Sequence, residues 1–104
     1  MSKKLFVSGP ITGIHDDNVD AFERAAHELD EAGYKVTVPT RMVKAGTPHA
    51  KAMRKCIGEL VRCDGVAQLA GWTCSKGAVT EARVGLVCGM RVMSVDAWVE
   101  EAKK

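Results

Sequence analysis

The chain has 104 residues, 46% of them hydrophobic and 27% charged, which is the composition of one globular domain over residues 1–104. Its net charge of +2 comes from interspersed basic and acidic residues, and only two Trp, one Tyr and two Phe are available for stacking, so we expect no nucleic-acid partner. The N-terminal apolar run is too short for a signal peptide or a membrane span, which predicts a cytoplasmic protein with no membrane partner.

The first elements predicted along the chain are a strand and a helix. Residues 3–8 form an apolar strand, and residues 18–32 form an amphipathic helix that Asp16 or Asp17 caps and Gly33 ends. One face of this helix carries Phe22, Ala25, Ala26 and Leu29.

The middle of the chain repeats this step. A second strand is expected at 34–38, followed by a loop of about ten residues that carries Arg41 and Lys44. The Thr-Pro pair at 47–48 then predicts a capped helix over 49–62 with proline at its first position. The apolar side of that helix consists of Met53, Cys56, Ile57 and Leu60.

The alternation of strands and helices continues to the end of the chain. Residues 65–70 predict a short buried strand, 71–77 a glycine-bounded loop, 75–88 a helix and 91–95 another strand. Asp96 is expected to cap a last amphipathic helix, which carries Trp98, Val99 and Ala102.

This alternation predicts an α/β fold: a small flavodoxin-like or Rossmann-like open parallel sheet with helices on both faces. With a strand order of about 2-1-3-4, the chain reverses direction across the sheet between the first and third strands. The turn at 8–13 and the loop at 71–77 would then meet at the carboxyl ends of these strands. Both glycine-containing segments would share one ligand crevice.

Glu81 stands just inside the helix that follows the 71–77 loop. At 100° per residue it lies on the border of the predicted buried stripe, beside small residues that leave room around its carboxylate. It is either a surface glutamate favoured by the helix dipole or a carboxylate of a small-molecule site. The stripe is Ala78, Val79, Ala82, Gly85 and Leu86, and the water-facing side is Lys76, Thr80 and Arg83.

Other residues near the two loops have both structural and functional interpretations. Ser75 caps the helix, holds an anionic oxygen of a ligand, or does both. Asp16, Asp17 and Asn18 bind sugar hydroxyls or cap a helix, and Trp72 shelters a base or packs as a lid. The turn at 9–13 matches neither G-x-G-x-x-G nor a P-loop. His15 lies in the turn and could donate a proton, whereas His27 and His49 are expected on helix surfaces.

The cysteines form no disulfide or metal pattern. Cys56 and Cys63 would lie about 10 Å apart along one helix, and neither they nor Cys74 and Cys88 form a C-x-x-C pair. Their spacing relative to the three histidines fits no zinc site, so we expect free thiols and no metal.

Four parts of the sequence together resemble a known family. They are the segment LFVSGPITG at 5–13, Asn18 with Phe22, the Cys-Asp pair at 63–64, and the residues from Gly71 to Glu81. That family is the DUF4406-like family of short phage and bacterial proteins of unknown function. This family is similar to nucleoside 2-deoxyribosyltransferases and deoxynucleotide N-hydrolases. The resemblance implies a homo-oligomer that needs no cofactor and binds a nucleoside or nucleotide.

The resemblance also implies roles for individual residues. Glu81 matches the glutamate that attacks the anomeric carbon, as in retaining glycoside chemistry. Ser75 matches a serine that contacts the 5'-phosphate in the hydrolases, whereas Pro10 stands where that branch has another serine and is more like the transferases. Nucleoside and nucleotide substrates therefore both stay open. The expected substrate-binding residues are Ser8, Gly9, Pro10, Thr12, Asp17, Asn18, Gly71, Trp72, Ser75 and Gly77.

Two positions depart from the family pattern. Phe6 replaces a tyrosine that positions the nucleophile, and Cys56 replaces an aspartate that assists the departing base. Since general acid-base help is commonly worth about 10²- to 10⁴-fold, three alternatives follow. The protein is a slow enzyme, an enzyme that uses His15 or Asp17 instead, or a binding protein that has lost catalysis.

Overall fold

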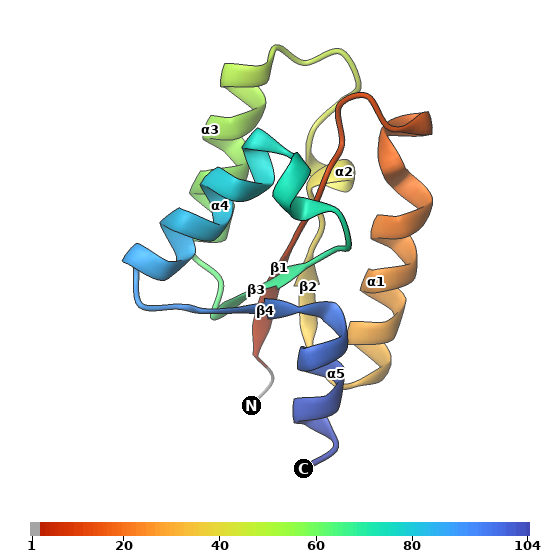
Figure 1. The fold of residues 1–104 in the computed structure, drawn as a ribbon, viewed down its shortest axis with the longest axis vertical. Coiled ribbons are helices and arrows are strands. Elements are labelled where there is room, and N and C mark those ends of the chain that lie inside the picture. The colour runs from red at the N-terminus through yellow and green to blue at the C-terminus, as the bar shows by residue number, and fades with distance from the viewer. Residues whose placement is uncertain (1–2) are drawn as a thin grey trace.

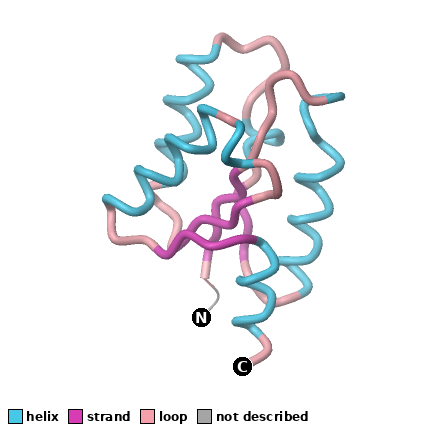
Figure 2. The backbone as a smooth tube through the Cα atoms, in the orientation of Figure 1, coloured by secondary structure: helices cyan, strands magenta, loops and turns pink. Residues whose placement is uncertain are grey.

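The protein forms a four-stranded parallel sheet, seen in a computed structural model that describes residues 3–104 (Figures 1 and 2). The strand order β2-β1-β3-β4 confirms the predicted order, and every neighbouring pair is parallel. The strands are β1 (Lys4–Ser8), β2 (Lys35–Thr37), β3 (Gly65–Gln68) and β4 (Arg91–Ser94).

Helices cover both faces of this sheet, as predicted. α1 and α5 lie on one face, and α3 and α4 lie on the other (Figure 1). The helices are α1 (Val19–Glu31), α2 (Pro39–Met42), α3 (His49–Leu60), α4 (Lys76–Val87) and α5 (Val95–Ala102), with 3-10 turns η1 (His15–Asn18) and η2 (Trp72–Cys74). Within residues 3–104, no helix combines the length and the apolar character that crossing a membrane requires.

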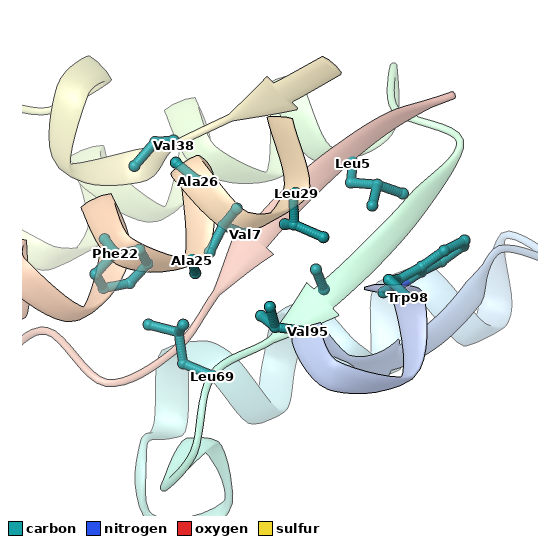
Figure 3. Packing of buried hydrophobic residues seen from close by; sticks show 11 residues of the cluster. Leu5, Val7, Phe22, Ala25, Ala26, Leu29, Val38, Leu69, Val95 and Trp98 are labelled. Carbon is teal, nitrogen blue, oxygen red and sulfur yellow. The ribbon is translucent and has the colours of Figure 1, made fainter. Parts of the chain in front are cut away.

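The alternation of side chains along β1 divides the core between the two faces. Leu5 and Val7 pack against the four predicted apolar residues of α1, all of which are buried (Figure 3). Phe6 points the other way, into a cluster with Cys56 and Leu60 of α3. Ser8, two residues further on, is on the same face as Phe6 and faces α4.

Trp98 anchors α5 to the sheet and explains why a glycine occupies the start of β3. The indole is 1% exposed, and its Nε1 donates a hydrogen bond to the carbonyl of Val66 at 2.8 Å. A Cβ atom at Gly65 would lie 2.5 Å from Cζ2 of Trp98, so the ring occupies the space of a side chain.

Replacing Gly65 by alanine is therefore expected to lower the free energy of unfolding by about 1–3 kcal/mol, because the added methyl overpacks the core. Gly58 provides the matched control, since a Cβ at this position in α3 meets nothing within 4 Å. Gly58→Ala should stabilise the protein by about 0.5–1 kcal/mol. Urea denaturation of both variants checks the prediction, and equal effects of the two substitutions would contradict it.

Three predicted helix caps are wrong, because the side chains concerned have other positions or partners. Asp16 and Asp17 do not cap α1: they adopt left-handed backbone conformations, and the helix starts after Asn18. Thr47 donates its hydroxyl to the carbonyl of Lys44, and Pro48 takes the N-cap position of α3, which begins at residue 49 as expected. At α5, Ser94 takes the capping role predicted for Asp96 and accepts a bond from the Ala97 amide.

Two further predictions about exposed residues are also wrong. Arg41 does not lie on a loop, because α2 includes it, and its guanidinium binds Glu23 of α1 at 2.7 Å. Leu86 is 63% exposed instead of buried. Gly85 makes the close approach to the sheet, where an added Cβ would lie 3.0 Å from Val92, so the next residue turns outward.

Candidate active site

A cavity of about 910 Å³ opens at the carboxyl ends of β1 and β3. The turn after β1, the loop before α3 and the start of α4 lie at this end of the molecule (Figure 1), and residues from all three line the cavity. Its position is the one where the strand order reverses, which is where open α/β sheets bind ligands. Its volume is in the range of sites for small molecules and cofactors.

Glu81 lies in the wall of this cavity and is almost fully buried. It comes from the second turn of α4 and is 5% exposed. The helix lies close to the sheet because Ala78, Ala82 and Gly85 face it with little or no side chain. Glu81 is thus deeper than the border position that periodicity predicts for it.

Ser8 orients the Glu81 carboxylate. Its hydroxyl donates a hydrogen bond to Glu81 Oε1 at 2.7 Å, joining residues 73 positions apart. Ser8 is 1% exposed, and its own carbonyl accepts the amide of Leu69, so the end of β1 holds it in place. One carboxylate oxygen is therefore fixed by Ser8, on a side chain that faces the cavity.

Burial raises the pKa of Glu81 from its ordinary value of 4.5 to about 7, although the hydrogen bond from Ser8 acts in the opposite direction. A carboxylate that titrates near neutral pH inside a cavity is typical of catalytic groups. Half of the Glu81 side chains are ionised at about pH 7, and more are ionised as the pH rises.

Ser75 caps α4, as predicted from the sequence. Its Oγ accepts a hydrogen bond from the Ala78 amide at 3.2 Å and lies on the cavity. The cap leaves the hydroxyl proton free, and the helix N-terminus adds a positive electrostatic potential. This end of the cavity is therefore suited to an anionic group.

One wall of the cavity was not predicted from the sequence. It is built from the loop at 43–47 and the first turns of α3, and it includes Lys44 and His49. A Cβ at Gly77 would lie 3.3 Å from Met53 Sδ and 3.8 Å from His49 Cε1, so the two helices approach closely there. Basic residues in the predicted loop were a sequence signal, but nothing in the helical period shows that His49 faces α4.

The structure brings together most, but not all, of the predicted site residues. Trp72 lies outside the Glu81 cavity and lines a second cavity of about 510 Å³ between α1 and α5. His15 is exposed, and Phe6 is fully buried in the core. The predicted residues that line the Glu81 cavity are Gly9, Pro10, Thr12, Asp17, Asn18, Gly71, Ser75 and Gly77.

Cys56 shares the cavity with Glu81 but cannot act as an acid of matched strength. Burial, followed by the charge of Glu81, raises the pKa of this thiol to about 11. The thiol is therefore neutral at physiological pH. All four cysteines are free, as predicted, and among residues 3–104 no three or more His, Cys, Asp or Glu side chains gather as metal ligands.

Fold and cavity together define an α/β protein with a switch-point site built around a buried carboxylate. A family model described as a domain of unknown function (DUF4406) matches residues 3–94, so the chain belongs to the DUF4406 family. No curated protein is a significant match.

The fold is similar to that of a solved structure, the 2-desoxiribosyltransferase from Leishmania mexicana. The TM-score is 0.70 at 14% sequence identity, and the match covers 88% of this chain. The chain spans 63% of that protein's length. At this identity the likeness shows that the two proteins share a fold, which confirms the fold expected from the sequence resemblance.

Proposed function

We propose that the protein cleaves or transfers the N-glycosidic bond of a deoxyribonucleoside or its 5'-monophosphate, with Glu81 as the nucleophile. The observation that carries this proposal is the buried Glu81 carboxylate, oriented by Ser8 in a cavity at the switch point. Glu81 attacks the anomeric carbon, the bond to the base breaks, and its electron pair leaves with the base nitrogen. Water or a second base then displaces Glu81.

The walls of the cavity offer contacts to both ends of such a substrate, the 5' group and the base. Ser75 and the N-terminus of α4 offer donors to a 5'-phosphate or 5'-hydroxyl, with Lys44 and His49 on the adjacent wall. The turn with Gly9 and Pro10 supplies another part of the wall for the sugar and base. A phosphate requirement would distinguish nucleotide from nucleoside substrates.

The test is to incubate the purified protein with a panel of deoxynucleosides and their 5'-monophosphates, each with and without an acceptor base. Free base is separated by chromatography, with Glu81→Ala as the control. Base release that vanishes in the variant supports the proposal, and dependence on the acceptor distinguishes transferase from hydrolase. Equal release by both proteins would refute it.

A second function, binding a nucleotide or nucleoside derivative without turnover, is favoured by two specific observations. Phe6 offers no hydroxyl near the nucleophile, and the Cys56 thiol is neutral. A binding protein would be stabilised thermally by a member of the panel while releasing no base from it.

Replacing Ser8 by alanine is expected to move the acid limb of the kcat/KM profile upward by about one pH unit. The hydrogen bond from Ser8 lowers the pKa of Glu81, and a bond to a charged group is worth about 1.5 kcal/mol or more. In the intact protein kcat/KM should rise as Glu81 ionises and fall where the group that protonates the departing base loses its own proton. Ser94→Ala removes a serine hydroxyl that does not line the Glu81 cavity and should leave the profile in place. A shift in this control, or none in Ser8→Ala, would contradict the prediction.

A further inference from the structure

We propose that Asp17 is a second catalytic carboxylate of the Glu81 cavity and protonates the departing base, the task for which Cys56 is unsuited. This inference rests on the proposed function. Asp17 and Glu81 reach the same cavity from separate elements, the turn η1 before α1 and the helix α4. A cavity that cleaves a glycosidic bond through one carboxylate generally needs a second group to handle the leaving-group proton.

The other titratable side chains of the cavity are less suited to this role. His49 and Lys76 lie at the N-terminus of α4, the end suited to an anion, and Lys44 is an exposed cation. Cys56 is buried and neutral beside Glu81. His15, the other acid suggested by the sequence, is exposed and does not line the cavity.

The backbone around Asp17 explains how this one carboxylate reaches the cavity. Asp16, Asp17 and Asn18 have φ values of 52°, 53° and 61°, a run of left-handed residues without any glycine. Asn18 links this turn to the cavity wall, because its Nδ2 donates a hydrogen bond to the carbonyl of Pro10 at 2.9 Å. The turn leaves Asp16 exposed and outside the cavity, whereas Asp17 is half-buried and lines it.

The proposed step conserves atoms and charge. A Glu81 oxygen forms a bond to the anomeric carbon as the bond to the base breaks, and the electron pair passes to the base nitrogen. The carboxyl of Asp17 gives its proton to the base and becomes a carboxylate. In hydrolysis, water then attacks the anomeric carbon and gives a proton to Asp17. The bond between the anomeric carbon and Glu81 breaks, and both carboxyl groups return to their starting states.

Asp17→Gly and Asp16→Gly make a matched pair of variants. Glycine accepts left-handed backbone geometry at both positions, and only the first substitution removes a carboxylate from the cavity. Base release is measured in a single turnover with protein in excess, so that only the first bond cleavage is observed. Imidazole, which titrates near neutral pH, is added as a diffusible proton donor.

We expect Asp17→Gly to cleave about 10²- to 10⁴-fold more slowly than the intact protein, and Asp16→Gly to stay within about threefold of it. Imidazole should restore at least about tenfold of the loss in Asp17→Gly and have no such effect on Asp16→Gly or Glu81→Ala. Asp17→Asn, which also accepts this backbone geometry, should show the same loss if the glycine variant unfolds.

Equal rates for Asp17→Gly and Asp16→Gly, or a loss that imidazole does not restore, would overturn the role of Asp17 while leaving Glu81 as the nucleophile. Failure of the proposed function gives a different result. In that case the intact protein and Glu81→Ala release base equally, whatever residue is present at position 17.

Discussion

Replacing Glu81 by glutamine is expected to reduce the rate of glycosidic-bond cleavage by roughly 10⁴-fold or more, since removing a covalent nucleophile has effects of this size. Glutamine has nearly the same shape and can still accept the hydrogen bond that Ser8 donates. The site should therefore keep its form and its affinity for ligand. The measurement is single-turnover base release, with ligand binding followed separately by thermal stabilisation.

Glu59→Gln is the control for this experiment. Glu59 lies on α3, binds Arg62 at 3.0 Å and does not line the Glu81 cavity. Its replacement should change the rate by less than about twofold, because an exposed ion pair contributes little even to stability. A comparable loss in both variants would mean that the effect of Glu81→Gln is not chemical.

The same substitution is expected to stabilise the protein at alkaline pH. In the unfolded chain the pKa of Glu81 has its ordinary value of 4.5, and burial raises it to about 7 in the folded protein. Below pH 4.5 the carboxyl is protonated in both states, and as the pH rises through about 7 the folded state must hold a buried charge. The intact protein thus loses about 3 kcal/mol of unfolding free energy over this range, which Glu81→Gln should retain.

Urea denaturation of both proteins at about pH 4 and about pH 8 checks this prediction. The lowered pKa of Glu23 beside Arg41 gives an opposite dependence on pH, but it is present in both proteins and cancels in the difference. A difference in unfolding free energy that does not grow between the two pH values would show that Glu81 carries no desolvation penalty.

The buried carboxylate of Glu81 has an energetic cost that a residue with a purely structural role would not need. A buried carboxylate with one hydrogen bond destabilises the folded protein at neutral pH, and an amide of the same shape would avoid the penalty. Positions that reduce stability in this way are characteristic of functional sites. The energetics of Glu81 therefore agree with the role proposed for it.

The sheet and its order could be predicted because the apolar patterns of the strands and α1 are unambiguous. The predicted strand at 3–8 and the buried face of α1 both occur in the structure. Once strands and helices alternate, right-handed crossovers leave few topologies. That topology also brings the turn after β1 and the loop after β3 to one cavity.

Details that depend on tertiary contacts could not be predicted. The burial of Glu81 depends on how closely Gly85 lets α4 approach β3 and β4, which the helical period alone does not contain. Likewise, the wall with His49 arises because α3 packs on α4. Trp72 lies outside the Glu81 cavity because η2 turns it toward the second cavity.

The cytoplasmic location and the homo-oligomeric state stay predictions. Light scattering on the purified protein measures the oligomeric state.

The most direct test of Glu81 as the nucleophile is to trap the glycosyl-enzyme. The protein is incubated with a deoxynucleoside, or its 5'-monophosphate, that carries fluorine at the 2' position to slow hydrolysis of the intermediate, then quenched with acid and analysed by intact-mass and peptide mass spectrometry. We predict a sugar adduct on the peptide containing Glu81, and none in Glu81→Gln. Release of base without any adduct, or an adduct on another residue, would contradict the proposed mechanism.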